Sequence, residues 1–279
     1  MNRLSTPNGS AFASAWLPVV ALISSASTPA IAQVAQPDQQ DVSAVTSNKQ
    51  QSASRWTLGA GVAEMPRFYG SEDYQTQPAP LIDVQLGRFF ARTGEGIGFN
   101  VLTGNRFTAG VSLNWIQGYD ADDVPIGINE VDDALGARVF VSARLKGAIA
   151  TLAATQAVTE SDRGMLVNAS FAYPIRATSR LMISPSLGAT WGNEKYLNGY
   201  FGVDAPESAA SGFNFYSPRG NGFRDVSLRV GVAYRITDKV TAVGSFGVTH
   251  LLDKAADSPL VERTTQPIGL VGLTYSFGR

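Results

Sequence analysis

The chain has 279 residues, with 22 basic and 23 acidic side chains and a formal net charge of −1. Such a balance gives no overall field that would attract nucleic acid, so we expect no nucleic-acid partner. The chain has no cysteine, which excludes disulfides, thiol nucleophiles and cysteine metal sites.

The N-terminal segment has the pattern of an export signal. Arg3 precedes the apolar run "AFASAWLPVVALISSAS", and small residues follow at Ala30 and Ala32. This pattern predicts a signal peptide over residues 1–32, cleaved near Ala32. The alternative is a cytoplasmic protein with a disordered tail.

Residues 33–54 are rich in Gln, Ser and Ala and have no aromatic side chain. Such a segment cannot bury enough apolar surface to offset its ordering entropy. We therefore predict a flexible periplasmic leader over 33–54 and a single β domain over 55–279.

Alternating segments recur from Arg55 to the end of the chain, separated by Gly, Asn and Asp turn signals. They predict twelve strands if the segment "APLIDVQLGRFFART" holds two short strands that turn at Gly87, and ten strands if it does not. The expected strands are 55–65, two short strands within 79–93, and 96–103, 106–117, 137–146, 148–159, 164–175, 180–191, 225–236, 239–250 and 265–277.

The segment "RDVSLRVGVAYRI" shows the two faces of such a strand. Val226, Leu228 and Val230 fall on one side, and Ser227 and Arg229 fall on the other. This pattern fits a soluble sandwich with a protein core, and it also fits a barrel whose apolar face meets lipid.

The connections favour the barrel. Tight links near residues 103, 146, 176 and 237 alternate with longer links over 66–78, 118–136, 193–223 and 251–264. Outer-membrane barrels have short periplasmic turns and long extracellular loops, whereas a sandwich has no reason to sort its connections in this way. We predict a transmembrane antiparallel β-barrel with Arg138, Arg144, Lys146, Arg229 and Arg235 facing the lumen.

Four segments resemble one protein family. They are "GAGVAEMPRFYGSEDYQTQPAPLIDV", "NEVDDALGARVF", "NGYFGVDAPESAASGFNFYSPRGNGFRDVSL" and "AADSPLVE", and together they are similar to the MipA/OmpV family of Gram-negative outer-membrane proteins. The resemblance implies an outer-membrane β-barrel. For the family's namesake it implies a scaffold that brings a murein-degrading enzyme and a murein synthase together, with no catalytic residue to carry over.

The C-terminus departs from the usual pattern of these barrels, which end on an aromatic residue. This chain ends "LTYSFGR", and Phe277 shares a face with Val271, Leu273 and Tyr275. We expect a slightly extended assembly signal.

Three features allow a ligand or a reaction. The acidic loop "YDADDVPIGINEVDD" has oxygen ligands for Ca²⁺ but lacks the spacing of a calcium loop, so we predict a solvated loop and no metal site. His250 is the only histidine, with Asp253 and Ser258 nearby, but a triad is defined by geometry, and we predict no catalytic residue. The aromatic loop from Asn193 to Phe223 is expected either to plug or cap the barrel, or to pack on its own rim.

The sequence thus leads to two functional hypotheses. The first is a non-enzymatic scaffold or adaptor in the outer membrane for murein-synthesising and murein-degrading enzymes, with no cofactor and with outer-membrane lipid and lipopolysaccharide around it. The alternative is a passive channel or uptake barrel for small solutes, and the inward cations would favour anionic ones. A lipid-modifying enzyme is a third and weaker reading.

Overall fold

The structure is a computed structural model that describes residues 54–160 and 163–277. The predicted signal peptide, and all of the predicted leader except Ser54, lie outside the described residues. The strands are β1 (Ser54–Pro66), β2 (Tyr74–Leu86), β3 (Phe89–Arg92), β4 (Gly96–Thr103), β5 (Phe107–Ile116), β6 (Ala134–Leu145), β7 (Ala148–Ala157), β8 (Met165–Ala172), β9 (Ile175–Arg176), β10 (Leu181–Gly192), β11 (Gly222–Arg235), β12 (Val240–Leu251) and β13 (Thr265–Ser276). The helices are α2 (Glu194–Phe201), α3 (Ala205–Ser211) and α4 (Asp253–Ala256).

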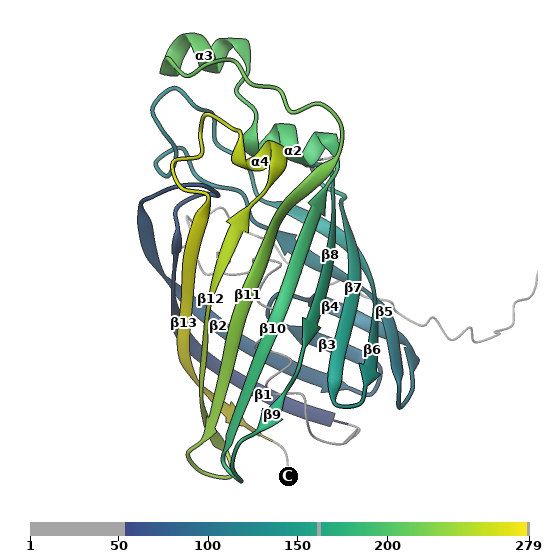
Figure 1. The fold of residues 1–279 in the computed structure, drawn as a ribbon. Coiled ribbons are helices and arrows are strands. Elements are labelled where there is room, and N and C mark those ends of the chain that lie inside the picture. Colours follow the sequence, from purple (N-terminus) through teal and green to yellow (C-terminus); the bar gives the residue numbers. More distant parts are fainter. Residues whose placement is uncertain (1–53, 161–162, 278–279) are drawn as a thin grey trace, which may run out of the picture. The chain divides into compact units, whose positions relative to one another are not determined.

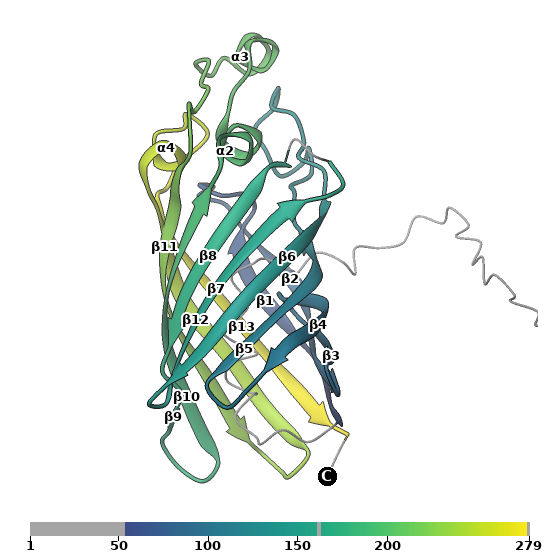
Figure 2. The same cartoon turned by 90° about the vertical axis from the view of Figure 1, so that its right-hand side faces the viewer.

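The strands close into a barrel. Each wall strand pairs antiparallel with its neighbours in the chain, and the first and last strands, β1 and β13, pair with each other (Figures 1 and 2). The wall has 12 strands, because β9 pairs with β10 beside β8 and only extends that strand. The break between β8 and β9 falls at Pro174, which has no N–H to donate to the ladder. The prediction of 12 strands is confirmed.

The turn at Gly87 decides between 12 and 10 strands. Leu86 pairs directly with Phe89, which leaves a two-residue connection. Gly87 has a φ of 59°, a left-handed conformation that glycine adopts without steric cost. The predicted turn is therefore present, and β2 and β3 are separate strands.

Strand β2 begins earlier than expected, at Tyr74 rather than at Ala79, and it therefore contains both Pro78 and Pro80. Proline cannot donate to a ladder, so within a sheet it needs a position where no donor is required. Ile82, which has the same parity as both prolines, bonds toward Thr93 rather than toward β1. The short strand β3 ends at Arg92, so the side of β2 on which the prolines lack a donor has no strand to meet.

The barrel is apolar on the outside. Along β11, Val226, Leu228 and Val230 are exposed, whereas Arg229 and Ala233 are buried. The inner face of the wall carries most of the buried polar side chains, including Thr57, Asn100, Ser112, Asn168, Ser184, Thr249, Gln266 and Thr274. A soluble sandwich would bury its apolar face, so this arrangement is that of a lipid-facing barrel. Among the described residues, no helix is long and apolar enough to cross a membrane.

The two rims of the barrel differ in the length of the connections between their strands. Short turns and the described chain ends, Ser54 and Phe277, lie at one rim, and the helices and longer loops lie at the other (Figure 1). The short 93–95 link between β3 and β4 lies partway along the wall, because Arg92 pairs with Asp83 and β2 continues outward from there to Tyr74. Outer-membrane barrels place short turns in the periplasm, so we refer to the first rim as the periplasmic rim. Exposed aromatic side chains surround it on the lipid side, namely Trp56, Phe89, Phe107, Tyr173, Tyr234, Tyr275 and Phe277.

The assignment of faces can be tested on β11. Val230→Arg places a charge in the apolar band and should cost about 2 to 4 kcal/mol of folding free energy, because the guanidinium loses its water. Ile236→Arg, at the periplasmic rim, is the matched control and should cost about 0 to 1 kcal/mol. Folded fraction in lipid vesicles, followed by heat-modifiable gel mobility across a urea series, measures both. Equal costs would contradict the assigned depth and faces.

Candidate functional site

The long loop after β10 folds over the outer mouth of the barrel. It begins with Asn193, whose side-chain oxygen accepts hydrogen bonds from the backbone N–H of Tyr196 and of Met165, both at 3.0 Å. The first bond caps α2, and the second ties the helix to the start of β8. One face of α2 is buried through Tyr196, Leu197, Tyr200 and Phe201. The loop thus caps the mouth and does not merely pack on its own rim.

Residues from several loops share one apolar core with α2, which we call the cap cluster. It consists of Phe68, Ile116, Tyr119, Val124, Ile128, Val131, Ala134, Ala157, Leu166, Tyr196, Leu197, Tyr200, Phe201, Val203, Leu251, Ala255 and Leu260. The members come from strand ends and from four outer connections. Because their burial is shared, no one of these loops can leave the mouth without exposing apolar surface of the others.

Tyrosines form the centre of the cap cluster. Tyr196 and Tyr200 stack with ring centroids 4.4 Å apart, and Tyr119 meets Tyr200 edge-on at 5.9 Å. The Tyr200 hydroxyl donates to the Gln117 carbonyl at 2.7 Å, and the Tyr119 hydroxyl donates to the Tyr200 carbonyl at 3.2 Å. Burial raises the pKa of both Tyr119 and Tyr200, so both hydroxyls keep their protons and remain donors at neutral pH.

A buried arginine joins the cap to the wall. Arg224, near the start of β11, is fully buried and pairs with Asp225. Its Nη1 donates to the Tyr196 hydroxyl at 2.7 Å, and its guanidinium carbon lies 4.2 Å from the ring centroid of Tyr69. A buried charge costs much free energy unless it has hydrogen-bond or ion-pair partners. The contacts of Arg224 with Tyr196 and Tyr69 therefore fix α2 and the loop after β1 against the wall.

A cavity of about 310 Å³ lies between the cap loops. Its lining includes Tyr119, Arg163 and the carboxylates Glu130, Asp204 and Glu207. Two of these carboxylates already serve the loops: Asp204 and Glu207 form the capping box of α3, and Glu207 also accepts from the Asn129 N–H at 3.0 Å. The cavity has room for a small polar molecule, but Asp204 and Glu207 are already engaged in contacts that hold the loops in place.

The predicted lumen-facing cations fall into two groups. Arg138 and Arg229 are buried in the inner wall, at 2% and 4% exposure. The Arg138 guanidinium lies 4.9 Å from the Phe140 ring, and its Nη1 and Nη2 have no hydrogen-bond partner among the described residues. That these two arginines contact a solute stays a prediction.

Arg144, Lys146 and Arg235 lie at the periplasmic rim. Arg144 and Lys146 are exposed, and Arg235 is half-buried and donates to the Ser179 carbonyl at 2.6 Å. Lys146 is in the turn between β6 and β7, with a φ of 48°. Their role toward any ligand also stays a prediction.

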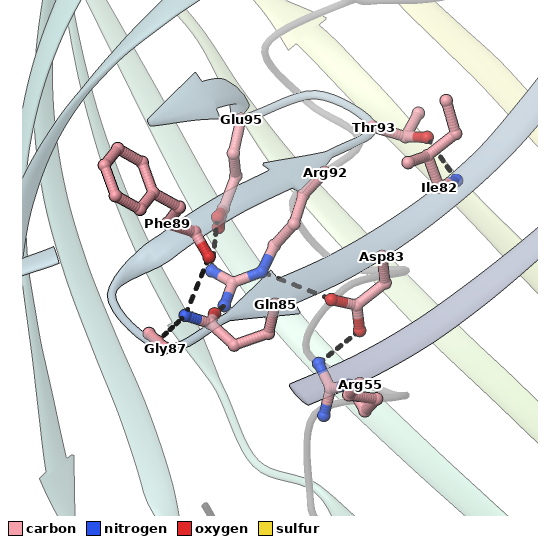
Figure 3. A network of polar contacts seen from close by, with 9 residues as sticks. All are labelled: Arg55, Ile82, Asp83, Gln85, Gly87, Phe89, Arg92, Thr93 and Glu95. Atoms are coloured by element: carbon pink, nitrogen blue, oxygen red, sulfur yellow. Dashed lines mark hydrogen bonds and ion pairs between the residues drawn. The ribbon is translucent and has the colours of Figure 1, made fainter. Parts of the chain in front are cut away.

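The sequence analysis missed a charge network on the inner wall (Figure 3). Asp83 pairs with Arg55 and with Arg92, whose Nε lies 3.3 Å from Asp83 Oδ1. Arg92 also contacts Glu95 and Gln85, each at 2.8 Å. Asp83 pairs directly with Arg92 in the ladder, so the opposite charges across the Gly87 turn were a signal that could have identified this network.

Two other candidates from the sequence are not assembled into sites. The Nδ1 of His250 lies 2.7 Å from the Thr265 hydroxyl, whereas the Ser258 hydroxyl donates to the Phe201 carbonyl at 2.7 Å. In the acidic loop, Asp133 accepts from the Gly118 N–H at 2.7 Å. No group of three or more acidic or histidine side chains within residues 54–160 and 163–277 could hold a metal ion.

The Arg224 contacts predict the stability of the cap. Arg224→Met breaks the buried ion pair between Arg224 and Asp225 by removing one of its charges, which should cost about 3 to 5 kcal/mol of unfolding free energy. The exposed Arg219 lies in the loop that precedes β11 and is the matched control. The unfolding free energy of Arg219→Met should stay within about 0.5 kcal/mol of the wild-type value. Urea unfolding in vesicles, together with protease cleavage within 193–221, measures both. A protected loop in Arg224→Met would contradict the role given to this arginine.

Comparison with known proteins places the chain in a family. The family model described as MltA-interacting protein MipA matches residues 58–277. The MltA-interacting protein of Escherichia coli strain K12 is 24% identical over 229 residues, which cover 80% of this chain and 90% of that protein. YiaT of the same strain, provisionally named an outer membrane protein, is 24% identical over 230 residues, covering 81% of this chain and 92% of YiaT.

Solved structures also match the chain. The NanC porin is 9% identical, with a TM-score of 0.38, and the match covers 80% of this chain and 99% of the porin. The family match extends from β1 to the residue after β13 and therefore includes the whole barrel wall and the cap. The chain belongs to the MltA-interacting protein (MipA) family and is an outer-membrane β-barrel of that family.

Proposed function

We propose that this protein is a non-enzymatic scaffold of the outer membrane that brings a murein-degrading and a murein-synthesising enzyme together. The observation that carries the proposal is the cap cluster, which packs four outer connections into one core over the mouth. A barrel built in this way can hold a fixed shape and present its periplasmic turns to partners. A solute channel would instead need an outer path.

The partner class follows from the family. The family description and a curated relative's name both describe interaction with MltA, and the resemblance in the sequence implies a murein scaffold. A protein in the outer membrane meets murein enzymes on its periplasmic side. We therefore assign partner contact to the periplasmic turns and to residues 33–54.

The absence of catalysis is part of the proposal. A serine hydrolase needs its nucleophile within reach of a general base. Here Ser258 is buried and donates to a backbone carbonyl, and the single histidine, His250, contacts Thr265. These contacts support a structural role for both residues.

Site-specific crosslinking tests the scaffold. A photoreactive residue at Asn105, exposed in the turn between β4 and β5, should capture murein enzymes in intact cells. The matched position is Asn214, which is exposed in the outer loop and should capture none of them. Mass spectrometry of the purified adducts identifies the partners. If Asn105 yields no murein enzyme, or Asn214 yields the same ones, the proposal fails.

The second candidate function is a channel for small anions, and the observation that favours it is the buried Arg138 guanidinium with no hydrogen-bond partner among the described residues. Conductance separates the two functions. As a scaffold, the intact protein should show negligible conductance in planar bilayers, whereas replacing residues 195–220 with a short Gly-Ser linker should open a pore. A wall of 12 strands encloses more space than side chains alone fill in an eight-strand barrel. Steady anion-selective current through the intact protein would favour the channel.

A further inference from the structure

The periplasmic rim is strongly basic, although the whole chain is nearly neutral. Apart from Arg55, which pairs with Asp83, the basic side chains along the turns and strand ends of this rim are Arg88, Arg106, Arg144, Lys146, Arg176, Arg180, Arg235 and Lys239. The same turns carry one acid, Asp238. No ion pair is found for any of these eight cations among the described residues. This rim therefore has positive charge that is not neutralised by an ion pair within residues 54–160 and 163–277.

Four of the arginines face one another in two pairs. Arg106 lies opposite Arg144, whose N–H donates to the Arg106 carbonyl at 2.8 Å, next to the pair formed by Phe107 and Ala143. Like charges directly opposite in a ladder are destabilising. The rim thus keeps an arrangement that costs stability in the free protein.

The second pair repeats the first farther along the same rim, two strands away. Arg180 lies opposite Arg235, whose N–H donates to the Arg180 carbonyl at 2.8 Å, next to the pair formed by Leu181 and Tyr234. Strands β7 and β8 separate β5 and β6 from β10 and β11. A ligand that neutralises both pairs must span this part of the rim.

The arginine pairs lie on the inner side of the rim. Their neighbours Phe107 and Tyr234 point outward and are exposed, at 51% and 45%. Side chains alternate along a strand, so the arginines have the opposite, inner parity. Interfacial aromatics therefore meet the lipid headgroups, and the arginines surround the opening.

We infer that the two arginine pairs form a docking site for an acidic segment of a periplasmic protein. The inference rests on the proposed function in taking a protein as the ligand. Arginine forks bind carboxylates through paired hydrogen bonds, and several carboxylates along one peptide can reach both pairs. A bound acidic segment would also remove the repulsion within each pair.

The charges at the outer rim indicate the side from which the ligand comes. The loop between β5 and β6 carries Asp120, Asp122, Asp123, Glu130, Asp132 and Asp133. This field repels an anion that approaches from outside, and the cap cluster covers that mouth. An anionic ligand therefore reaches the arginine pairs from the periplasm.

A labelled deca-glutamate peptide tests this site on the full-length protein in phosphatidylcholine nanodiscs. Fluorescence anisotropy should show binding that weakens as salt increases, since exposed charges are screened. The variants Arg106→Gln/Arg144→Gln and Arg180→Gln/Arg235→Gln should each bind about tenfold more weakly, the effect of two lost carboxylate contacts. The matched control Arg219→Gln, an exposed arginine of the outer loop, should bind like wild type. Heat-modifiable mobility confirms that every variant is folded.

Three results would overturn the inference. The first is wild-type affinity in both folded double variants, and the second is an equal loss in Arg219→Gln. The third is loss of peptide binding in phosphatidylglycerol nanodiscs at matched ionic strength, because lipid phosphate would then occupy the arginines. The peptide result is independent of crosslinking at Asn105. Peptide binding without captured murein enzymes would refute the scaffold and leave the site, and capture without peptide binding would refute the site alone.

Discussion

The structure depends on one constraint: in lipid, every backbone N–H and C=O must be satisfied within the protein. A sheet comes closest to meeting this demand when its first and last strands pair, and here β13 closes onto β1 along Thr57–Glu64. The outer part of β2 meets no described strand on its second side, because β3 pairs with β2 only from Asp83 to Leu86. Closure also explains which irregularities are tolerated. The interruption at Pro174 lies near the periplasmic rim, where β9 resumes the pairing with β10, and Pro78 and Pro80 lie where β3 has already ended.

The barrel reverses the distribution of side chains found in a soluble protein. The outer face of the wall is apolar, and the inner face carries polar and charged side chains that need hydrogen-bond or ion-pair partners. Asp83 is paired with two arginines, and Arg224 donates a hydrogen bond to the Tyr196 hydroxyl. Both lie on inner positions of strands, and Arg224 also holds the cap. The largest apolar cluster lies in the loops over the mouth, and two smaller apolar clusters are built from buried residues of the wall strands.

Most of the fold could be predicted from the alternation of apolar and polar residues and from the turn signals. The alternating segments located the wall strands, and Gly87 decided their number, because both depend on local geometry that one sequence displays. The cap could be predicted only as far as the aromatic content of its longest loop. Its core joins Phe68, Tyr119, Tyr200 and Leu260 from four separate connections, and no local pattern reports such contacts. The partners of Arg224 were missed for the same reason, since Tyr69 and Tyr196 are distant in sequence.

The arginines at the two ends of the barrel differ in their partners. At the outer end, the one buried arginine that supports the cap has an acid and two tyrosines around it. At the periplasmic end, the arginines face each other, and their acids are missing from the described chain. The same alternation that keeps the aromatic belt in lipid turns these arginines toward the opening. The docking site that we infer for an acidic segment follows from this difference between a capped outer end and a basic periplasmic end.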